Sequence, residues 1–288
     1  MPIAITLREL IEAGTHFGSA TARWNPLMKP YIHSKQSKIH IIDLRETIKG
    51  VIRATRFLEQ ISAQGKRVLF VGTKRQAADI MRQEGQRSES FFVANRWLGG
   101  TLTNMNTMRN RINRLNELES LETTGRMHEF SKKMISSLTR ERKKIFRNFE
   151  GIRNMHELPG AVVVVDPGNE HICVAETVKL GIPLIGLVDT DDNPEKLDFV
   201  IPANDDAYRS IHLLVSRLAD AVVEGRKKAA TQGAMQQRAQ GGSGAARGES
   251  RADRSAAAAA PEAAKAADAG AGTAEEFGKM GGFSMGGE

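Results

Sequence analysis

The chain has 288 residues, 40% of them hydrophobic, so it is long enough to bury a substantial core. Its single cysteine excludes an intramolecular disulfide framework and a cysteine cluster for zinc. Its longest apolar runs, about five residues, fall far short of the roughly 20 that cross a bilayer, and the N-terminal stretch lacks the layout of a signal peptide. We therefore expect a soluble, cytoplasmic protein.

The net charge of +7 is unevenly distributed along the sequence. Residues 109–153 contain twelve Lys or Arg against six Asp or Glu, whereas residues 154–224 contain four against thirteen. A protein that lies with one face against a polyanion has this asymmetry. A dipolar enzyme surface explains the charges equally well, so charge alone does not decide between the two.

A short helix over 6–13, opened by a capping box, leads toward the segment 23–31, which its two prolines predict to be extended. There Trp24 alternates with Arg23 and Lys29, an arrangement that can stack on RNA bases and contact phosphates. A packed loop with surface bases explains the same residues.

An alternation of strands and helices follows. Continuous apolar runs, typical of buried parallel strands, alternate with segments that have a helical period. Strands are expected at 39–42, 68–71, 91–94, 161–165, 184–188 and 199–201, and helices at 45–62, from about 75 to 84, 170–179 and 205–224. The predicted fold class is α/β: a Rossmann-like or flavodoxin-like parallel sheet with helices on both faces.

The stretch Asn95–Asn104 joins the strand-forming part to an insertion at 104–153. Apolar residues recur there at steps of three and four, which predicts two helices joined by a turn: an antiparallel coiled-coil hairpin roughly 30 Å long. Gly99 and Gly100 provide a backbone hinge. Arg96 and Trp97 either face RNA or lock the hairpin to the domain, and the sequence does not choose between these.

Basic side chains decorate the predicted hairpin and would contact phosphates if it binds RNA. Solvated faces of coiled coils carry similar charges, so any single residue has a plain alternative. The domain limits follow from these patterns: an α/β domain at 1–103 and 154–225, the hairpin at 104–153, and a tail at 226–288 whose Ala, Gly and Ser content predicts disorder.

The loop Gly72-Thr73-Lys74 follows a predicted strand and precedes a helix, which is where an enzyme can bind a phosphate. However, no Gly-x-Gly-x-x-Gly follows a strand, and there is no Walker motif. Aspartates cluster after the later strands, where a structural cation could bind with His16, Asp189 and Asp205 as candidate ligands. Helix capping and turn formation explain much of that cluster, so we expect no cofactor and no catalytic residue.

Several ordered motifs resemble the S-two family of bacterial small-subunit ribosomal proteins over about residues 5–225. They include Thr15-His16-Phe17-Gly18, Arg23-Trp24-Asn25-Pro26, Leu69-Phe70-Val71-Gly72-Thr73-Lys74, Arg96-Trp97-Leu98-Gly99-Gly100-Thr101-Leu102-Thr103-Asn104 and Ile201-Pro202-Ala203-Asn204-Asp205-Asp206. The chain departs from the family pattern at Ser19, Asp191 and Ala203.

The resemblance implies a non-enzymatic protein of the small ribosomal subunit that binds ribosomal RNA and neighbouring ribosomal proteins, including the messenger-binding protein S-one, but neither DNA nor a membrane. A nucleotide or sugar-phosphate enzyme and an RNA-binding regulator outside the ribosome stay as alternatives. The residues expected to contact RNA are Arg23, Trp24, Lys29, Lys74, Arg75, Arg96, Trp97, Thr101, Asn104, Arg109, Arg111, Arg114, Lys132 and Lys133.

Overall fold

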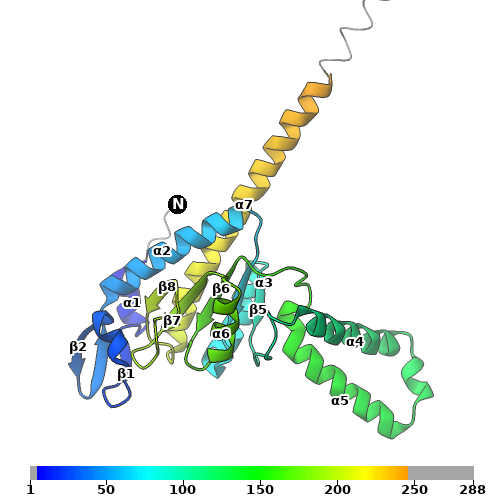
Figure 1. Cartoon of the computed structure of the whole chain (residues 1–288), viewed down its shortest axis with the longest axis horizontal. Helices are drawn as coiled ribbons and strands as arrows, with labels where there is room; N and C mark the ends of the chain where they lie inside the picture. The colour runs from blue at the N-terminus through cyan, green and yellow to red at the C-terminus, as the bar shows by residue number, and fades with distance from the viewer. Residues whose placement is uncertain (1–4, 246–288) are drawn as a thin grey trace, which may run out of the picture. The chain divides into compact units, whose positions relative to one another are not determined.

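A computed structural model describes the backbone of residues 5–245 and the side chains of residues 5–231. The described residues as far as Gln236 belong to one compact unit. Five parallel strands form its central sheet (Figure 1), in the order β5-β4-β6-β7-β8. They are β4 (Val68–Val71), β5 (Phe91–Val93), β6 (Ala161–Val165), β7 (Leu184–Val188) and β8 (Phe199–Pro202). Each lies within a residue of the apolar run that predicted it, and the order is that of flavodoxin-like folds.

The two faces of the sheet bury alternate residues of each strand, because successive side chains point to opposite sides. Phe70 and Val163 belong to the core cluster beneath α2 (Leu44–Ala63), α3 (Arg75–Arg87) and α7 (Tyr208–Ala245). Leu69 and Val162 belong to the opposite cluster, together with α6 (His171–Lys179). The prediction of helices on both faces of a parallel sheet is therefore confirmed.

A second sheet was not predicted. β1 (Phe17–Ala20), β3 (Ile39–Ile42) and β2 (Ile32–Gln36) form an antiparallel sheet in the order β1-β3-β2. The strand at 39–42 was predicted correctly, but its place in the parallel sheet was wrong. A four-residue apolar run has no feature that distinguishes a buried parallel strand from one strand of a small ribbon.

The segment that was expected to be extended contains the 3₁₀ helix η1 (Pro26–Tyr31). The Asn25 side chain accepts the backbone N–H of Leu27 and caps the helix, and Pro26 occupies its first turn, where its missing N–H is harmless. Prolines therefore began a short helix here instead of preventing one.

The insertion consists of α4 (Met105–Thr123), η2 (Arg126–Glu129), α5 (Lys132–Phe149) and η3 (Glu150–Ile152). Asn104 and Ser131 cap the two long helices with their side-chain oxygens. α4 and α5 contact each other and lie side by side next to β5 (Figure 1). We refer to residues 104–153 as the arm.

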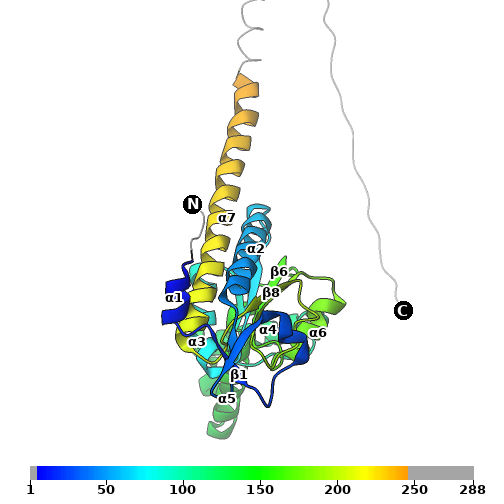
Figure 2. The same ribbon diagram turned by 90° about the vertical axis from the view of Figure 1, so that its left-hand side faces the viewer.

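The last helix of the described residues is α7, which runs beside α1 (Leu7–Glu12) (Figure 2). Arg217 of α7 pairs with Glu9 of α1 at 3.7 Å. The backbone is helical as far as Ala245, whereas disorder was expected from residue 226; the rest of the expected tail lies outside the described residues. Between residues 5 and 245, no helix has the length and apolar character needed to cross a membrane.

Candidate nucleic-acid interface

The carboxyl ends of β4 and β6 mark the point where strand order reverses, which is the usual ligand site of a flavodoxin-like sheet. The loop after β4 places the Thr73 N–H there, at the start of α3. That N–H donates to Oε1 of Glu170 at 3.0 Å, and the Thr73 hydroxyl donates to the same oxygen. An internal carboxylate therefore occupies the donors that would bind a phosphate.

Lys74, the next residue, is enclosed by acids. Its Nζ lies 3.3 Å from Asp166, 3.0 Å from Asp205 and 2.5 Å from Asp206. Burial alone would lower the pKa of the lysine, but the hydrogen bond to Asp206 and the charges of Asp205 and Asp166 raise it overall. In this structure the ammonium group of Lys74 pairs with aspartates, and these pairs compete with the RNA contact that was expected for it.

We call the loops after β4, β6, β7 and β8 the carboxyl edge. Within the described residues, the acids brought together there are Asp166, Asp192 and Asp205, with one oxygen of each inside 4.8 Å of the others. His16, which was a candidate ligand, is outside this group, and burial lowers its pKa. Asp189 is also outside it and accepts the backbone N–H groups of Ser19 and Thr190.

Burial of these carboxyls raises their pKa values. The pKa of Asp192 is raised to about 7 by burial and by the nearby charge of Asp166. Asp189 also rises to a pKa of about 7, mainly through burial, and burial together with Asp166 raises the pKa of Asp205 to about 8. The carboxyl edge thus has more buried acids than partners for them.

The root of the arm, residues 96–104, is held by a single carboxylate that the sequence did not single out. Glu176 projects from α6 and is only 8% exposed. Its oxygens accept the indole N–H of Trp97 at 3.1 Å and the backbone N–H groups of Gly100 at 2.7 Å, Leu102 at 3.0 Å and Thr103 at 3.2 Å. The Thr103 hydroxyl is a fifth donor, at 3.2 Å.

These donors reverse the effect of burial on Glu176. Desolvation would raise its pKa, but the bonds from Gly100, Trp97, Leu102 and Thr103 lower it overall. The only sequence signal was an acid on the buried face of α6, three residues after Cys173. That signal is too common to identify such a residue without its partners.

Two of the residues expected to contact RNA are buried at this root. Trp97 is 6% exposed and Thr101 is 1% exposed, with the threonine hydroxyl donating to the Leu98 carbonyl at 2.5 Å. The choice that the sequence left open is thus decided: Trp97 locks the arm to the domain. Its neighbour Arg96 is exposed, and Asn104 is exposed while capping α4.

The arm separates its basic residues into engaged and free ones. Arg114 bonds to Glu117 at 3.1 Å and to Glu141 at 3.3 Å, and Arg109 donates to the His156 carbonyl at 2.7 Å. Arg114 is thus paired with two carboxylates, and Arg109 is bonded to the backbone beyond the arm. The remaining candidates on the arm are exposed, and no ion pair occupies them within the described side chains: Arg111, Lys132 and Lys133.

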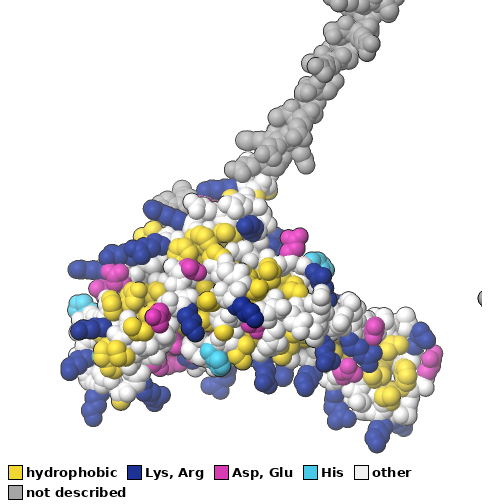
Figure 3. Space-filling model, in the orientation of Figure 1, with side chains coloured by type: hydrophobic (Ala, Val, Ile, Leu, Met, Phe, Trp, Pro, Cys, Tyr) yellow, Lys and Arg dark blue, Asp and Glu magenta, His cyan; other side chains and the backbone are white. Residues whose placement is uncertain are grey.

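The other candidates lie on the α/β domain. Arg23, Lys29 and Arg75 are exposed, and Trp24 is half-buried with its ring 5.2 Å from that of His40. Figure 3 shows Lys and Arg side chains around much of the rim of the molecule, with few acids among them on the arm's lower side. Most of the expected basic residues are therefore exposed, whereas Lys74 and Arg114 are half-buried and paired with acids.

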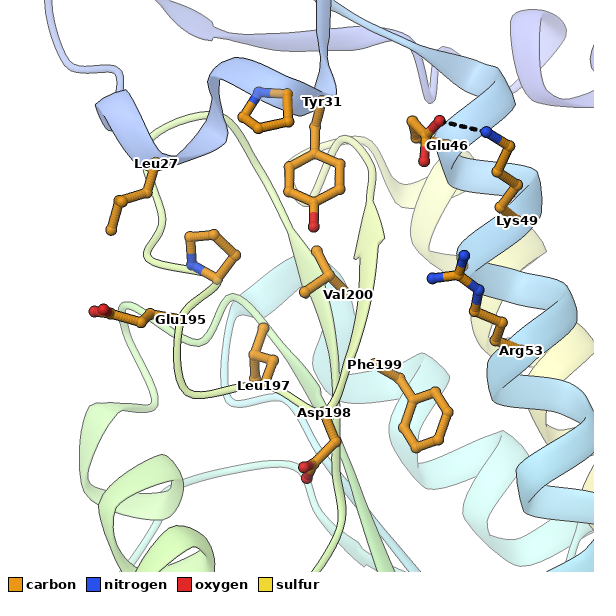
Figure 4. A pocket seen from close by; sticks show the side chains of 13 residues that line it. Leu27, Tyr31, Glu46, Lys49, Arg53, Glu195, Leu197, Asp198, Phe199 and Val200 are labelled. Atoms are coloured by element: carbon orange, nitrogen blue, oxygen red, sulfur yellow. Dashed lines mark hydrogen bonds and ion pairs between the residues drawn. The ribbon is translucent and has the colours of Figure 1, made fainter.

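A hollow of about 400 Å³ lies between η1, α2 and β8 (Figure 4). Tyr31, Phe199 and Leu27 give it apolar walls, and charged side chains surround these, including Arg53 and Asp198. β8 is an edge strand of the sheet. The hollow thus combines apolar walls with a charged border.

Comparison with known proteins agrees with these features. The model of the family described as ribosomal protein S2 matches residues 10–225. A small ribosomal subunit protein uS2 from Rhodopirellula baltica is 46% identical over 228 residues, which is 79% of this chain and 88% of that protein. A uS2 from Chloroflexus aurantiacus is 45% identical over 228 residues, covering 79% of this chain and 96% of that protein.

Proposed function

Because this chain belongs to the ribosomal protein S2 family, and is therefore a structural component of the small subunit of the cytoplasmic ribosome and not an enzyme, we propose that it binds ribosomal RNA through exposed bases on its arm and domain. The residues proposed to contact RNA are Arg23, Trp24, Lys29, Arg75, Arg96, Asn104, Arg109, Arg111, Lys132 and Lys133. The observation that carries the proposal is the contrast between the exposed Lys and Arg residues of this set and Lys74, whose charge is neutralised internally.

The mechanism is scaffolding by electrostatic contact. Each exposed base that approaches a phosphate releases bound counterions, which gives affinity without reading sequence. At the carboxyl edge, Glu170 accepts the Thr73 donors, and aspartates pair with Lys74. These acids repel a small phosphate ligand, which favours a role without small-molecule chemistry over the nucleotide-enzyme alternative.

We propose further that α4 and α5 form an antiparallel coiled coil. Met108, Leu115 and Leu118 of α4 are buried in one cluster with Leu138 and Ile145 of α5, as a shared apolar seam requires. Ion pairs also join the helices, from Arg114 to Glu141 at 3.3 Å and from Arg142 to Glu122 at 2.9 Å. A stiff arm would hold its bases at fixed spacing along an RNA groove.

Among neighbouring proteins, we propose that the messenger-binding protein S-one docks at the hollow in Figure 4. The support is its mixed lining: Tyr31 and Phe199 offer ring surface, and charged side chains border it. Tyr31→Ala should reduce the amount of S-one that sediments with small subunits by about tenfold, as expected for an aromatic anchor. Unchanged S-one in subunits that contain the variant would refute this docking site.

Sucrose-gradient sedimentation tests the RNA proposal. Arg111→Ala, Lys132→Ala and Lys133→Ala together should reduce incorporation into small subunits and lower the salt dependence of RNA binding by about two units of log–log slope. Arg114→Ala is the matched control on the same arm, because its guanidinium is already paired. Equal losses from both variants would show that charge on the arm acts without specific contact.

A further inference from the structure

The outer face of α2 carries a row of basic residues that the sequence reading did not single out. Arg45, Lys49, Arg53 and Arg56 are all exposed. At about 100° per residue, the four positions fall within an arc of about 80°, and at 1.5 Å per residue they extend over about 16 Å. Figure 3 shows Lys and Arg side chains along the upper left rim, over α2.

Helix stability does not explain this row. Arg45 lies in the first turn of α2, where a positive charge is opposed by the helix dipole. The two acids of α2 are each engaged by a lysine: Glu46 bonds to Lys49 at 2.7 Å, and Glu59 bonds to Lys228 of α7. The helix therefore has no spare carboxylate to offset its arginines.

The three arginines have no counter-charge. Within the described side chains, the guanidinium groups of Arg45, Arg53 and Arg56 form no ion pair or hydrogen bond, whereas Arg114 on the arm has two carboxylate partners. Unpaired guanidinium groups in a row along one helix face are complementary to a line of phosphates. The acids of the nearby hollow, Glu195 and Asp198, form no ion pair with Arg53.

We propose that Arg45, Lys49, Arg53 and Arg56 form a second RNA-binding surface, separate from the arm, which binds the sugar-phosphate backbone of an RNA strand. The proposal rests on the function proposed above, because a ribosomal protein has RNA as its main polyanion. The strand belongs either to ribosomal RNA packed beside α2 or to another RNA that crosses the assembled subunit. Spacing along the helix gives phosphate contact and not base recognition, so the surface is indifferent to sequence.

The test uses the full chain with Arg45→Ala, Arg53→Ala and Arg56→Ala combined. A first experiment measures binding to a small-subunit ribosomal RNA transcript as a function of salt. A second experiment measures binding of a single-stranded RNA 12-mer to small subunits reconstituted with the variant. In the experiment that contains the true partner, the log–log salt slope should fall by about two and the affinity should fall on the order of tenfold at low salt.

Two further variants make the result decisive. Arg45→Lys, Arg53→Lys and Arg56→Lys together keep the charge and should restore the slope. Lys179→Ala, Lys196→Ala and Arg209→Ala together remove the same charge from exposed positions off α2 and should leave it unchanged. A loss of affinity confined to the first experiment identifies ribosomal RNA as the partner, and a loss confined to the second identifies another RNA strand.

Circular dichroism first shows that the alanine variant is folded. The proposal is overturned if this variant keeps the wild-type salt slope in both experiments, or if its affinity falls no more than that of the off-helix control. A protein neighbour is identified instead if crosslinks from position 56, which lies outside the hollow of Figure 4, reach protein but not RNA, and that result also overturns the proposal. Failure of the wild type itself to enter small subunits would contradict the proposed function, and it is observed before any variant is compared.

Discussion

The carboxyl edge and the root of the arm are both organised around acids, yet they have opposite balances of donors. α6 contributes to both: Glu170 precedes the helix and faces the carboxyl edge, and Glu176 faces the root. At the edge, Asp166, Asp205 and Asp206 share one lysine, and burial raises the pKa values of Asp205 and of nearby Asp192. At the root, one carboxylate receives five donors, and its pKa is lowered.

The difference teaches that burial does not by itself set the charge state of an acid. Burial raises the pKa in both regions, but the number of N–H and O–H donors decides the net direction. The root is therefore stabilised by an ionised carboxylate, whereas the edge carries electrostatic strain at neutral pH. Four substitutions test this contrast, in order of expected effect.

Glu176→Ala should have the largest effect. It leaves buried N–H groups of Trp97, Gly100 and Leu102 without their acceptor, so we expect a loss of about 3–5 kcal/mol in the free energy of unfolding. Hydrogen exchange at 97–104 should rise first, because this is where the donors lie. Denaturant unfolding measures the energy.

The pH dependence of Glu176 provides its control. Its folded pKa lies below the ordinary value of 4.5, so its stabilisation is present above that value and is lost as pH falls through the folded pKa. Protection of the root in the wild type should decline on acidification below about pH 4.5, while Glu176→Gln should lack that step. Retained protection in Glu176→Ala would show that apolar packing alone holds the arm.

Asp192→Asn should have the opposite sign. The folded pKa of Asp192 is about 7 against an ordinary 3.8, so the folded state holds its proton over that window and stability falls as pH rises through it. The amide keeps an oxygen for the Gly168 N–H and removes the charge, so we expect a gain of about 1–3 kcal/mol at pH 8.

Thermal unfolding at pH 5 and pH 8 measures this difference. The variant should show a flatter pH profile than the wild type. A destabilised variant at pH 8 would mean that the Asp192 carboxylate has a favourable partner when ionised, and that the edge is not strained.

Trp97→Phe tests the locking role of the indole. The ring volume stays largely filled, but the N–H bond to Glu176 is lost, so we expect destabilisation of about 1.5 kcal/mol. RNA affinity of the folded protein should not change, because the side chain is 6% exposed. A tenfold loss of RNA affinity with unchanged stability would instead show that Trp97 contacts RNA.

Glu170→Gln should have the smallest effect, within about 0.5 kcal/mol. Both Thr73 donors use the same oxygen, Oε1, which glutamine can supply, and burial already raises the pKa of this acid. Glu176→Gln is the matched comparison within α6. Its new NH₂ group must face one set of donors, so we expect a loss of about 2 kcal/mol in the free energy of unfolding. Equal changes in the free energy of unfolding at the two positions would show that the carboxyl edge and the root do not differ in this way.

Local sequence patterns were sufficient to predict most of the helices and strands. The apolar runs at 68–71, 161–165 and 184–188 became parallel strands because a strand covered on both faces must be apolar throughout. The two helices of the insertion formed as predicted, with caps at Asn104 and Ser131 that are local because a capping side chain acts within three residues of itself. The family was also identified from the sequence, through motifs in a fixed order.

The site could be predicted only in part, since its decisive contacts join distant residues. Glu176 and Trp97 are 79 positions apart, and Lys74 and Asp205 are 131 apart. An isolated Lys after a Gly-Thr turn looks the same whether phosphate or aspartate will neutralise it. The distinction between an exposed Trp and a locking Trp likewise depends on a partner from another helix.

The sequence by itself thus determined the fold class, the strands and the family, because these depend on composition and on periods of two to four residues. The tertiary structure alone decided which bases stay free for RNA, with Lys74 and Arg114 neutralised and the row on α2 left open. The physical reason is that a charge becomes available or engaged through the groups that folding brings within a few ångströms, and sequence spacing does not encode that distance.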